Sequence, residues 1–558
     1  MKHRTLAARG AAALLAVSVS LSLAPSVARA GGFYLLDRGT RPLGRGGAFV
    51  AGADDPGALW YNPAGLGLSG EQLLVDATLS FLDVSFTRID GAGNTMPTVN
   101  GQSAPLPIPT IGVSFDLGLD RHFTFGVGIF APNAALMQYP ESLTVDGMPY
   151  PAPQRYSLLS MEGSVIATLA LGAAWTPLPD ELSIGLGLHL ITGAFAARVA
   201  MSACEGAICT FPEDPDYDGV AQMTLAPIFT ASAVLGVTWR PDRGPVRIGA
   251  SMSTPFSLSG PASIEVRPPS AAAFDGAIVR SRAGDCASVP DEEVAASPDH
   301  GCRDTTADLN LNFPLVLRVG VELLAIENLR VEAAVVWETW SFQRDVSVQP
   351  RDVWIVDALG FLDYEVGALS IPRNMRDTVS VRLGGEYTID RTFQIRLGGY
   401  WENGAFDDEY LSPLTIDSDK IVVAGGFSAR LEGGFWADVM VGYAHLFARQ
   451  VRNSQVPQTN PIRPPVPDAG PGRQPGDPVF IGNGDYSFTA PFVGVGIRWL
   501  PDWTATPAPV EEEPERSADG PASDDAEPEV PATDPSRPWY QQGAGAAAAP
   551  VDAGLAPA

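Results

Sequence analysis

The feature that most constrains the fold of this chain is a long series of segments in which apolar and polar residues alternate. Between residues 378 and 389, odd positions are mostly apolar, and even positions are polar or glycine. A period of two predicts a strand with one apolar face and one polar face. Residues 392–402 repeat the pattern after a junction of two residues, so the two segments predict a hairpin of long strands.

The same alternation predicts fourteen strands in all, and many exceed the five or six residues typical of soluble strands. Short connections alternate with long ones, which is typical of outer-membrane barrels with short periplasmic turns and long outer loops. We therefore predict an all-β fold, a 14-stranded antiparallel transmembrane β-barrel over residues 71–500. The predicted strands are 71–88, 108–117, 122–131, 156–175, 182–200, 223–239, 246–266, 308–324, 329–343, 376–389, 392–402, 420–430, 435–449 and 485–500.

The first thirty residues (1–30) predict a secretory signal peptide. Basic residues precede an apolar stretch from Ala11 to Ala24, and Ala28-Arg29-Ala30 fits the small-x-small cleavage pattern. The alternative, an uncleaved anchor, is disfavoured because the apolar stretch is shorter than the roughly 20 residues that span a bilayer. No later segment is apolar for that length, so a chain that crosses the membrane must pair its backbone groups between strands of a closed barrel.

The strand that starts at Asp308 shows which faces we expect to meet lipid. Its even positions, including Asn310, Asn312, Arg318 and Glu322, are expected to face the lumen. A soluble sandwich would also bury the apolar set, but the leader, the strand lengths and the loop asymmetry favour the barrel. The residues expected to face lipid are Leu309, Leu311, Phe313, Leu315, Leu317, Val319, Val321 and Leu323.

Four cysteines in a chain bound for an oxidising compartment predict two local disulfides. The simplest pairing joins Cys204 to Cys209 and Cys286 to Cys302. A zinc site is the alternative, but only His300 lies close to a cysteine in the sequence, so we expect no metal centre there.

One loop offers a weak calcium candidate. Asp214, Asp216 and Asp218 have the spacing at which alternate carboxylates converge on a calcium ion. The twelfth position of that motif is Leu225 and not the bidentate glutamate, so a solvated acidic turn is the favoured interpretation.

Three stretches carry a family resemblance. The first, residues 43–66, is rich in glycine and ends in Asn62-Pro63-Ala64-Gly65-Leu66, directly before the first predicted strand. The second is Trp337-Glu338-Thr339-Trp340-Ser341-Phe342. The third is the hairpin of residues 377–400, which contains Leu383-Gly384-Gly385 and Leu397-Gly398-Gly399. Together they resemble the FadL/TodX family of outer-membrane transporters for long-chain fatty acids and aromatic hydrocarbons. The resemblance covers roughly residues 31–500 and implies that residues 31–70 form an N-terminal hatch inside the barrel lumen.

The resemblance implies that the hatch gates the barrel, because ligand occupancy would shift it between a holding and a releasing shape. Its glycines leave backbone freedom and its prolines fix turns. The candidate hatch and gating residues are Gly44, Arg45, Gly46, Gly47, Asp54, Asp55, Asn62, Pro63, Ala64 and Gly65.

Charges on the hatch suggest how it is held. We expect Arg45, Asp54 and Asp55 to pair with charges that face the lumen, and the alternative is that the lumen charges only hydrate the channel. The lumen charges in question are Arg382, Arg396, Glu386 and Glu402.

The third strand departs from the family. Family members often have a proline followed by glycine at a kink there, whereas this chain has Pro132-Asn133-Ala134 as the candidate strand kink. The kink and the lateral exit that the resemblance implies are therefore left open, beside exit into the periplasm.

Ligand capture is expected to involve the outer loops. The loop 132–155 holds apolar residues that either line a groove or pack on neighbouring loops. Arg155 and Arg198 are the arginines considered for a ligand carboxylate, although neither is distinguished from ordinary charges in the sequence.

The residues after Pro501 predict a disordered acidic tail rich in proline and alanine (501–558). It holds twelve acidic and two basic residues and therefore a net charge of −10 out of the −28 of the whole chain. The acidity of the chain is partly a property of this tail, and nucleic acid is not expected as a partner.

These observations predict a protein of the outer membrane of a Gram-negative bacterium that takes up long-chain fatty acids or other hydrophobic small molecules passively. It is expected to be a monomer in contact with outer-membrane lipid and lipopolysaccharide, without cofactor. The alternatives are a general polar porin or a structural barrel, which would lack a glycine-rich hatch. A barrel lipase is the enzymatic alternative, and no G-x-S-x-G motif supports it.

Overall fold

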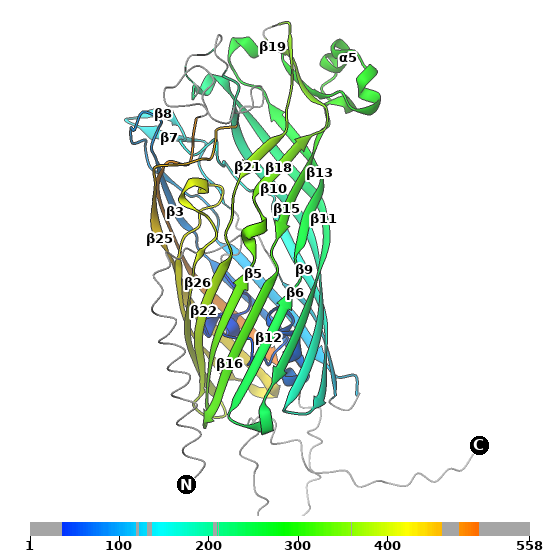
Figure 1. The fold of residues 1–558 in the computed structure, drawn as a ribbon, viewed down its shortest axis with the longest axis vertical. Coiled ribbons are helices and arrows are strands. Elements are labelled where there is room, and N and C mark those ends of the chain that lie inside the picture. The colour runs from blue at the N-terminus through cyan, green and yellow to red at the C-terminus, as the bar shows by residue number, and fades with distance from the viewer. Residues whose placement is uncertain are drawn as a thin grey trace, which may run out of the picture.

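In the computed structural model, fourteen antiparallel strands close into a barrel (Figure 1). The structure describes residues 36–118, 122–130, 137–204, 209, 211, 213–358, 360–459 and 479–501. The barrel closes where β2 (Gln72–Ser80) pairs with β26 (Gly484–Trp499), with Leu73 opposite Trp499. The expected signal peptide and nearly all of the expected tail lie outside the described residues.

Several strands of the wall consist of two segments joined by a short break, so the barrel is taller than a single run of strands. Within the described residues, no helix has the length and hydropathy needed to cross a membrane. The remaining segments of the barrel wall are β3 (Asp83–Arg88), β4 (Val99–Asn100), β5 (Leu106–Phe115), β6 (Phe123–Phe130), β9 (Val165–Leu178), β10 (Leu182–Ser202), β11 (Asp218–Trp239), β12 (Val246–Ser253), β13 (Phe256–Arg267), β15 (Thr305–Phe313), β16 (Val316–Ile326), β17 (Leu329–Glu338), β18 (Asp345–Pro350), β21 (Leu369–Pro372), β22 (Thr378–Thr388), β23 (Phe393–Glu402), β24 (Lys420–Arg430) and β25 (Phe435–Val451).

The long connections gather at one end of the barrel and carry two small sheets of their own (Figure 1). One sheet holds β14 (Ile278–Ser281), β19 (Val353–Ala358) and β20 (Leu362–Glu365), beside the short helix α5 (Asp291–Ala296). The other is the hairpin of β7 (Ser142–Val145) and β8 (Met148–Pro151). Because short turns are periplasmic and long loops are extracellular in such barrels, this end faces the cell exterior.

The lower half of the wall follows the predicted alternation. On β22 and β23, Val381, Leu383 and Leu397 are exposed on the outer face, while Arg382 and Arg396 are buried inside. The outer face of this half is therefore apolar and suits the hydrocarbon of a bilayer, as predicted. We call this half the membrane section; it comprises β2, β5, β6, β9, β12, β16, β17, β22–β24 and the periplasmic parts of β10, β11, β25 and β26.

The upper half reverses the polarity, and here the sequence-based assignment of faces was wrong. Leu309, Leu311 and Phe313 on β15 were expected to face lipid, but they are buried inside, and Asn310 is exposed outside. A break at Pro314 and Leu315 separates β15 from β16, where Val319 and Leu323 face outward as expected. The strand changes face at this break because its upper part stands in water, where the polar face turns outward.

The same polarity holds around the upper half. Val84 and Phe86 on β3 and Tyr486 on β26 are buried inside, whereas Ser487 is exposed. We call this half the extracellular section; it comprises β3, β4, β13, β15, β18, β21, the outer parts of β10, β11, β25 and β26, and the long loops. Two predicted strand boundaries were also wrong: residues 156–164 form a mostly buried loop before β9, and β17 ends at Glu338 before a short 3-10 helix (Trp340–Phe342).

Candidate functional site

The N-terminal segment from Leu36 to Gly70 folds inside the membrane section and fills its lumen, the position expected for the hatch (Figure 1). It contains the short helices α2 (Thr40–Gly44), α3 (Ala58–Tyr61) and α4 (Leu66–Ser69), with a 3-10 turn at Pro63–Gly65. Nearly every residue between Thr40 and Leu66 is buried. We call this segment the hatch.

Asn62 fixes the turn that ends in Gly65. Its side-chain oxygen accepts a hydrogen bond from the Ala64 N–H at 3.2 Å, and Pro63 occupies the first helical position, where a missing N–H costs nothing. Its side-chain nitrogen donates to the Val50 carbonyl at 2.8 Å and to the Val237 carbonyl on β11 at 3.1 Å. One side chain therefore folds the hatch and ties it to the wall.

Glycine permits the close approach of hatch and wall at one point in particular. Gly46 has a φ of 61°, and a Cβ added to it would overlap the backbone of Gly399. On the wall side, a Cβ at Gly384 or Gly398 would overlap the backbone of Arg45. Three glycines thus let two backbones touch with no side chain between them.

Glu332 on β17 is the acceptor that holds the middle of the hatch. Its carboxylate accepts hydrogen bonds from the N–H groups of Val50 at 2.6 Å, Ala51 at 2.9 Å and Gly52 at 2.9 Å. The guanidinium of Arg45 lies 3.5 Å from the same carboxylate. Both side chains are fully buried, so each charge depends on its partners for stabilisation.

Arg41 and Asp54 of the hatch continue the network. Arg41 pairs with Asp54 within the hatch and with Glu386 on β22 at 2.9 Å. Arg330 on β17 bridges Asp54 of the hatch and Glu322 on β16, the latter at 2.8 Å. The hatch is therefore joined to the wall by buried ion pairs on several strands.

The specific pairings expected from the sequence differ from those in the structure. Arg45 contacts Glu322 and Glu332, and Asp55 bonds inside the hatch to the Gly57 N–H. Among the lumen charges, Arg382 pairs with Asp37, and Glu402 pairs with Lys420. Glu386 pairs with Arg41 of the hatch and with Arg396, and Arg396 also pairs with Asp438.

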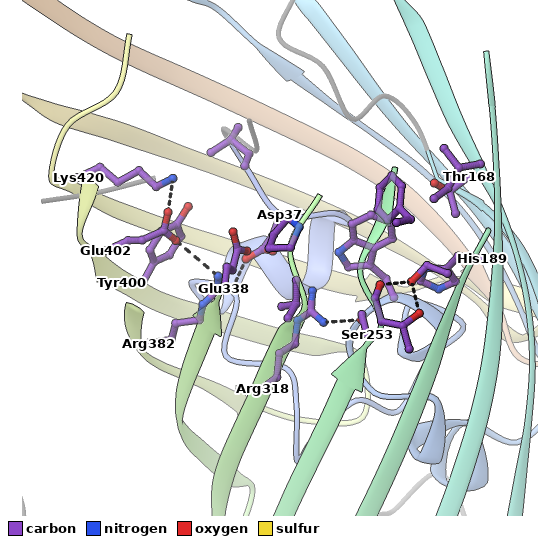
Figure 2. A pocket seen from close by; sticks show the side chains of 18 residues that line it. Asp37, Thr168, His189, Ser253, Arg318, Glu338, Arg382, Tyr400, Glu402 and Lys420 are labelled. Atoms are coloured by element: carbon purple, nitrogen blue, oxygen red, sulfur yellow. Dashed lines mark hydrogen bonds and ion pairs between the residues drawn. The ribbon is translucent and has the colours of Figure 1, made fainter. Parts of the chain in front are cut away.

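A small polar cavity of about 60 Å³ lies directly above the hatch (Figure 2). Trp60 of the hatch lines it and stacks on His189, with ring centroids 5.5 Å apart. Figure 2 shows Arg318 next to Ser253, to which it donates at 3.2 Å, and Lys420 next to Glu402 at 2.7 Å. We call this the polar pocket.

A larger cavity of about 340 Å³ lies above it in the extracellular section. Strands β10, β11, β13, β15 and β18 supply one part of its wall, and loop segments supply most of the rest. We call it the apolar chamber; its apolar lining includes Leu158, Met161, Phe195, Met223, Leu309 and Leu311.

Arg373, which follows β21, is the one cation among the residues that line the chamber. It donates to the Thr415 hydroxyl at 2.9 Å and to the Ser412 hydroxyl at 3.3 Å, and its Nε has no acceptor. Among the described residues no carboxylate lies within ion-pair distance. Burial lowers the pKa of Arg373 to about 10, so the guanidinium remains charged at pH 7.

Nothing in the sequence distinguishes Arg373, and the two arginines considered for a ligand carboxylate are already paired. Arg155 donates to Asp218 at 2.7 Å, and Arg198 lies 2.5 Å from Glu141. Arg373 differs from them because it is buried and no carboxylate among the described residues pairs with it. No local motif reveals that property, because the missing partner is a feature of the fold.

The remaining candidates are placed as follows. The structure joins Cys204 to Cys209 and Cys286 to Cys302, both in extracellular loops. Asp218 is occupied by Arg155 and Tyr156, and no cluster of three potential metal ligands occurs among the described residues. The kink candidates Pro132, Asn133 and Ala134 lie outside the described residues, just after β6.

Two apolar residues of the loop 132–155 pack against their neighbours. Met137 and Tyr139 are buried, and the Tyr139 hydroxyl donates to the Pro413 carbonyl at 3.3 Å. Met148, at the tip of the β7–β8 hairpin, is exposed. Packing between loops thus accounts for two of these residues.

Comparison with known proteins gives one family and a set of related folds. The family described as "Outer membrane protein transport protein (OMPP1/FadL/TodX)" matches residues 21–466. No curated protein matches the chain.

Several solved structures share the fold at low sequence identity. A FadL homologue from Pseudomonas aeruginosa aligns with a TM-score of 0.62 and 15% identity over 84% of this chain and 99% of that one. The toluene transporter TbuX from Ralstonia pickettii gives 0.51 and 16% over 84% and 100%. The toluene transporter TodX from Pseudomonas putida gives 0.51 and 13% over 84% and 99%.

Proposed function

Because the chain belongs to the outer membrane protein transport family (OMPP1/FadL/TodX), we propose that it takes up hydrophobic compounds passively across the outer membrane. The substrates are long-chain fatty acids or aromatic hydrocarbons, captured in the apolar chamber and released past the hatch. The observation that carries this proposal is the position of the chamber on the extracellular side of the polar pocket and of a lumen that the hatch fills.

The apolar chamber supplies the binding energy. Burying an acyl chain contributes about 0.8 kcal/mol per CH₂ group, so apolar walls such as Leu309, Leu311 and Met223 capture a hydrocarbon from water. Release requires a second shape of the site, and the hatch supplies it if ligand binding shifts the hatch between two conformations. The residues from Gly44 to Gly65 named above are proposed as the moving part.

Arg373 favours fatty acids over neutral hydrocarbons as substrates of this chamber. A buried guanidinium with a free Nε–H and no carboxylate partner among the described residues suits a ligand carboxylate. The hydroxyls of Ser412 and Thr415 hold the guanidinium in place. TbuX and TodX are named as toluene transporters, and toluene would use the same apolar walls without this contact.

The hatch argues against a general polar porin. A porin needs an open aqueous lumen, whereas the lumen of the membrane section is occupied by buried hatch residues and their ion pairs. The proposed mechanism uses no catalytic residue. We also propose that the protein acts as a monomer, with its exposed apolar band in contact with outer-membrane lipid and the extracellular section among lipopolysaccharide.

The test is uptake of radiolabelled oleate and of radiolabelled toluene by cells that lack their own transporter and express this chain. The informative variant is Ala221→Trp, which fills the chamber because Ala221 is buried in its wall. The matched control is Gln222→Trp, because Gln222 is the next residue of β11 and is exposed outside.

We expect saturable uptake of oleate by the unmodified chain and by Gln222→Trp, and a loss of at least tenfold in Ala221→Trp. Uptake of toluene alone would assign the chain to aromatic hydrocarbons. The absence of saturable uptake of both compounds would overturn the proposal.

A further inference from the structure

The lumen face of β2 carries a buried carboxylate, Asp76, for which the described residues supply no cation. One of its oxygens, Oδ2, accepts a hydrogen bond from the Thr40 N–H of the hatch at 2.9 Å. The other oxygen, Oδ1, is buried and has no hydrogen-bond partner among the described residues. A buried carboxylate is costly unless its charge is paired, so Asp76 calls for a further partner.

A second carboxylate nearby shows how the lumen normally holds such a charge. Asp438 on β25 and Asp76 on β2 lie on either side of Gly496 of β26. Asp438 pairs with Arg498 at 2.6 Å and with Arg396 at 3.4 Å. Asp76 has no arginine or lysine within ion-pair distance in the described part of the chain, and the two arginines beside it are occupied by Asp438.

Two threonines on the wall lie next to Asp76 and face the lumen with it. Thr110 is directly opposite Asp76 in the ladder between β2 and β5, and opposite side chains have Cβ atoms about 4.5–5.5 Å apart. Its hydroxyl is near enough to stabilise the carboxylate, but neither Thr110 Oγ1 nor Asp76 Oδ1 makes a hydrogen bond of ordinary geometry. Thr78 is the next lumen-facing residue of β2, and its hydroxyl is also buried without a partner among the described residues.

A third hydroxyl comes from the hatch. Thr40 is the first residue of α2 and is bonded to Asp76 through its N–H. Its Oγ1 lies against Gly494 of β26, where an added Cβ would approach it to 2.9 Å, and Gly494 is opposite Thr78. This hydroxyl is therefore beside both Asp76 and Thr78, and no described residue bonds to it. We call Asp76, Thr40, Thr78 and Thr110 the oxygen cluster.

The oxygen cluster has the chemistry of a site for a hard cation. Four buried oxygen atoms without partners meet where the hatch touches the wall, and buried polar atoms of this kind need a water molecule or an ion. Carboxylate and other oxygen ligands bind hard cations, with distances of about 2.3–2.6 Å for Ca²⁺, and Na⁺ is of nearly the same size. One such ion bridges oxygens about 5 Å apart, the spacing of opposite side chains on a sheet.

The charge of the cluster selects a monovalent ion. One carboxylate balances one positive charge, whereas a divalent ion would leave a net charge buried in the lumen. No group of three His, Cys, Asp or Glu side chains occurs among the described residues, and the oxygen cluster agrees with that finding because three of its four side chains are threonines.

The position of the cluster gives the ion a structural role. The ion pairs of the hatch reach β16, β17 and β22, and β16 and β17 lie across the barrel from β2. We propose that Asp76, Thr40, Thr78 and Thr110 bind one monovalent cation, of the size of sodium, which joins the start of the hatch to β2. The site is independent of which substrate the protein transports.

Hydrogen exchange of the hatch amides, measured by mass spectrometry on the purified full chain, tests this site. Exchange is compared in about 0.15 M sodium chloride and in choline chloride at the same concentration, so that screening is equal. The informative variant is Asp76→Asn, which keeps an oxygen for the Thr40 N–H and loses the charge. The matched control is Asp83→Asn, because Asp83 is an exposed carboxylate of β3.

We expect the amides around Thr40 to exchange at least tenfold more slowly in sodium than in choline, because an ion that binds only the closed hatch stabilises it by mass action. Asp83→Asn should keep this difference, and in Asp76→Asn the two salts should agree within twofold. Thr78→Val removes an oxygen without changing the shape, and it should reduce the difference to threefold or less. Thr124→Val, which removes a buried hydroxyl of β6, should leave the difference unchanged.

Three results contradict the proposal. Equal exchange of the unmodified chain in both salts would mean that the oxygen cluster holds water or a proton and no cation. A tenfold difference that persists in Asp76→Asn would place the effect of sodium elsewhere. If Asp76→Asn does not fold, Thr78→Val decides, and a difference equal to that of Thr124→Val would overturn the site.

Discussion

The membrane section and the extracellular section share several strands, yet they reverse which face is apolar. Below the breaks, Leu383 and Val319 face outward, and the lumen holds Arg396, Glu332 and Glu322. Above the breaks, Asn310 faces outward and the lumen holds Leu309 and Leu311. Strands such as β10, β11, β25 and β26 contribute to both sections, so the difference is set by what lies outside the wall.

This difference shows how one barrel performs two tasks. A wall that is apolar outside leaves its polar face for the lumen, and buried charges there must be paired. The hatch supplies those partners and seals the channel. A wall that stands in water turns its apolar face inward, and no hatch fills the space, so a chamber for apolar molecules results.

We expect the largest effect from Glu332→Ala, which should release the hatch and open the lumen of the membrane section. The substitution removes the acceptor of three hatch N–H groups and the partner of Arg45. Breaking a buried pair in this way costs about 3–5 kcal/mol. We expect proteoliposomes with this variant to swell in arabinose, which the unmodified protein should exclude. Glu265→Ala, which removes an exposed carboxylate of β13, is the control and should not swell.

Arg373→Gln tests whether the chamber binds the carboxylate of a fatty acid. Loss of the guanidinium should weaken oleate binding about tenfold, or about 1.4 kcal/mol, and should leave methyl oleate within twofold. Arg376→Gln is the matched control, because Arg376 is half-exposed and already pairs with Asp407 at 3.2 Å. Equal weakening for oleate and its methyl ester would mean that Arg373 acts only through packing.

A smaller effect is expected from pH. Burial lowers the pKa of Arg373 to about 10, so the cation is present below that pH and is lost as the pH rises through it. Oleate affinity should therefore be constant between pH 7 and 9 and fall above about pH 10. Equilibrium binding across this range checks the prediction, and a fall already below pH 8 would point to another titrating group.

The smallest effect concerns the extracellular loop that holds α5. Cys286→Ser with Cys302→Ser removes the disulfide that fixes the segment around α5. Such a loop loses about 3 kcal/mol of local stability, so protease should cut between residues 286 and 302. Oleate uptake should change less than twofold, and a larger loss would extend the transport machinery into this part of the extracellular section.

The fold could be predicted from the sequence because it depends on local patterns of residues. The alternation on β22 and β23 and the alternating loop lengths predict an all-β barrel with fourteen strands. The faces of β15 were assigned wrongly because apolar residues were assumed to meet lipid along the whole strand. That assumption fails above Pro314, where the outer face meets water.

The candidate site could be predicted only in part from the sequence. The glycine-rich run and Asn62 indicate a hatch, because close backbone approach and a tight turn require particular residues. Arg373 and the partners of Arg45 were not accessible, because they depend on which residues lie close in space.

The most direct test of the division between a sealed and a capturing section is to record single-channel conductance of the intact protein in planar bilayers, beside oleate uptake by cells that express it. We expect saturable uptake with no steady conductance, because the hatch fills the lumen while the chamber binds the acyl chain. A steady ion conductance without saturable uptake would contradict it and would leave a polar porin.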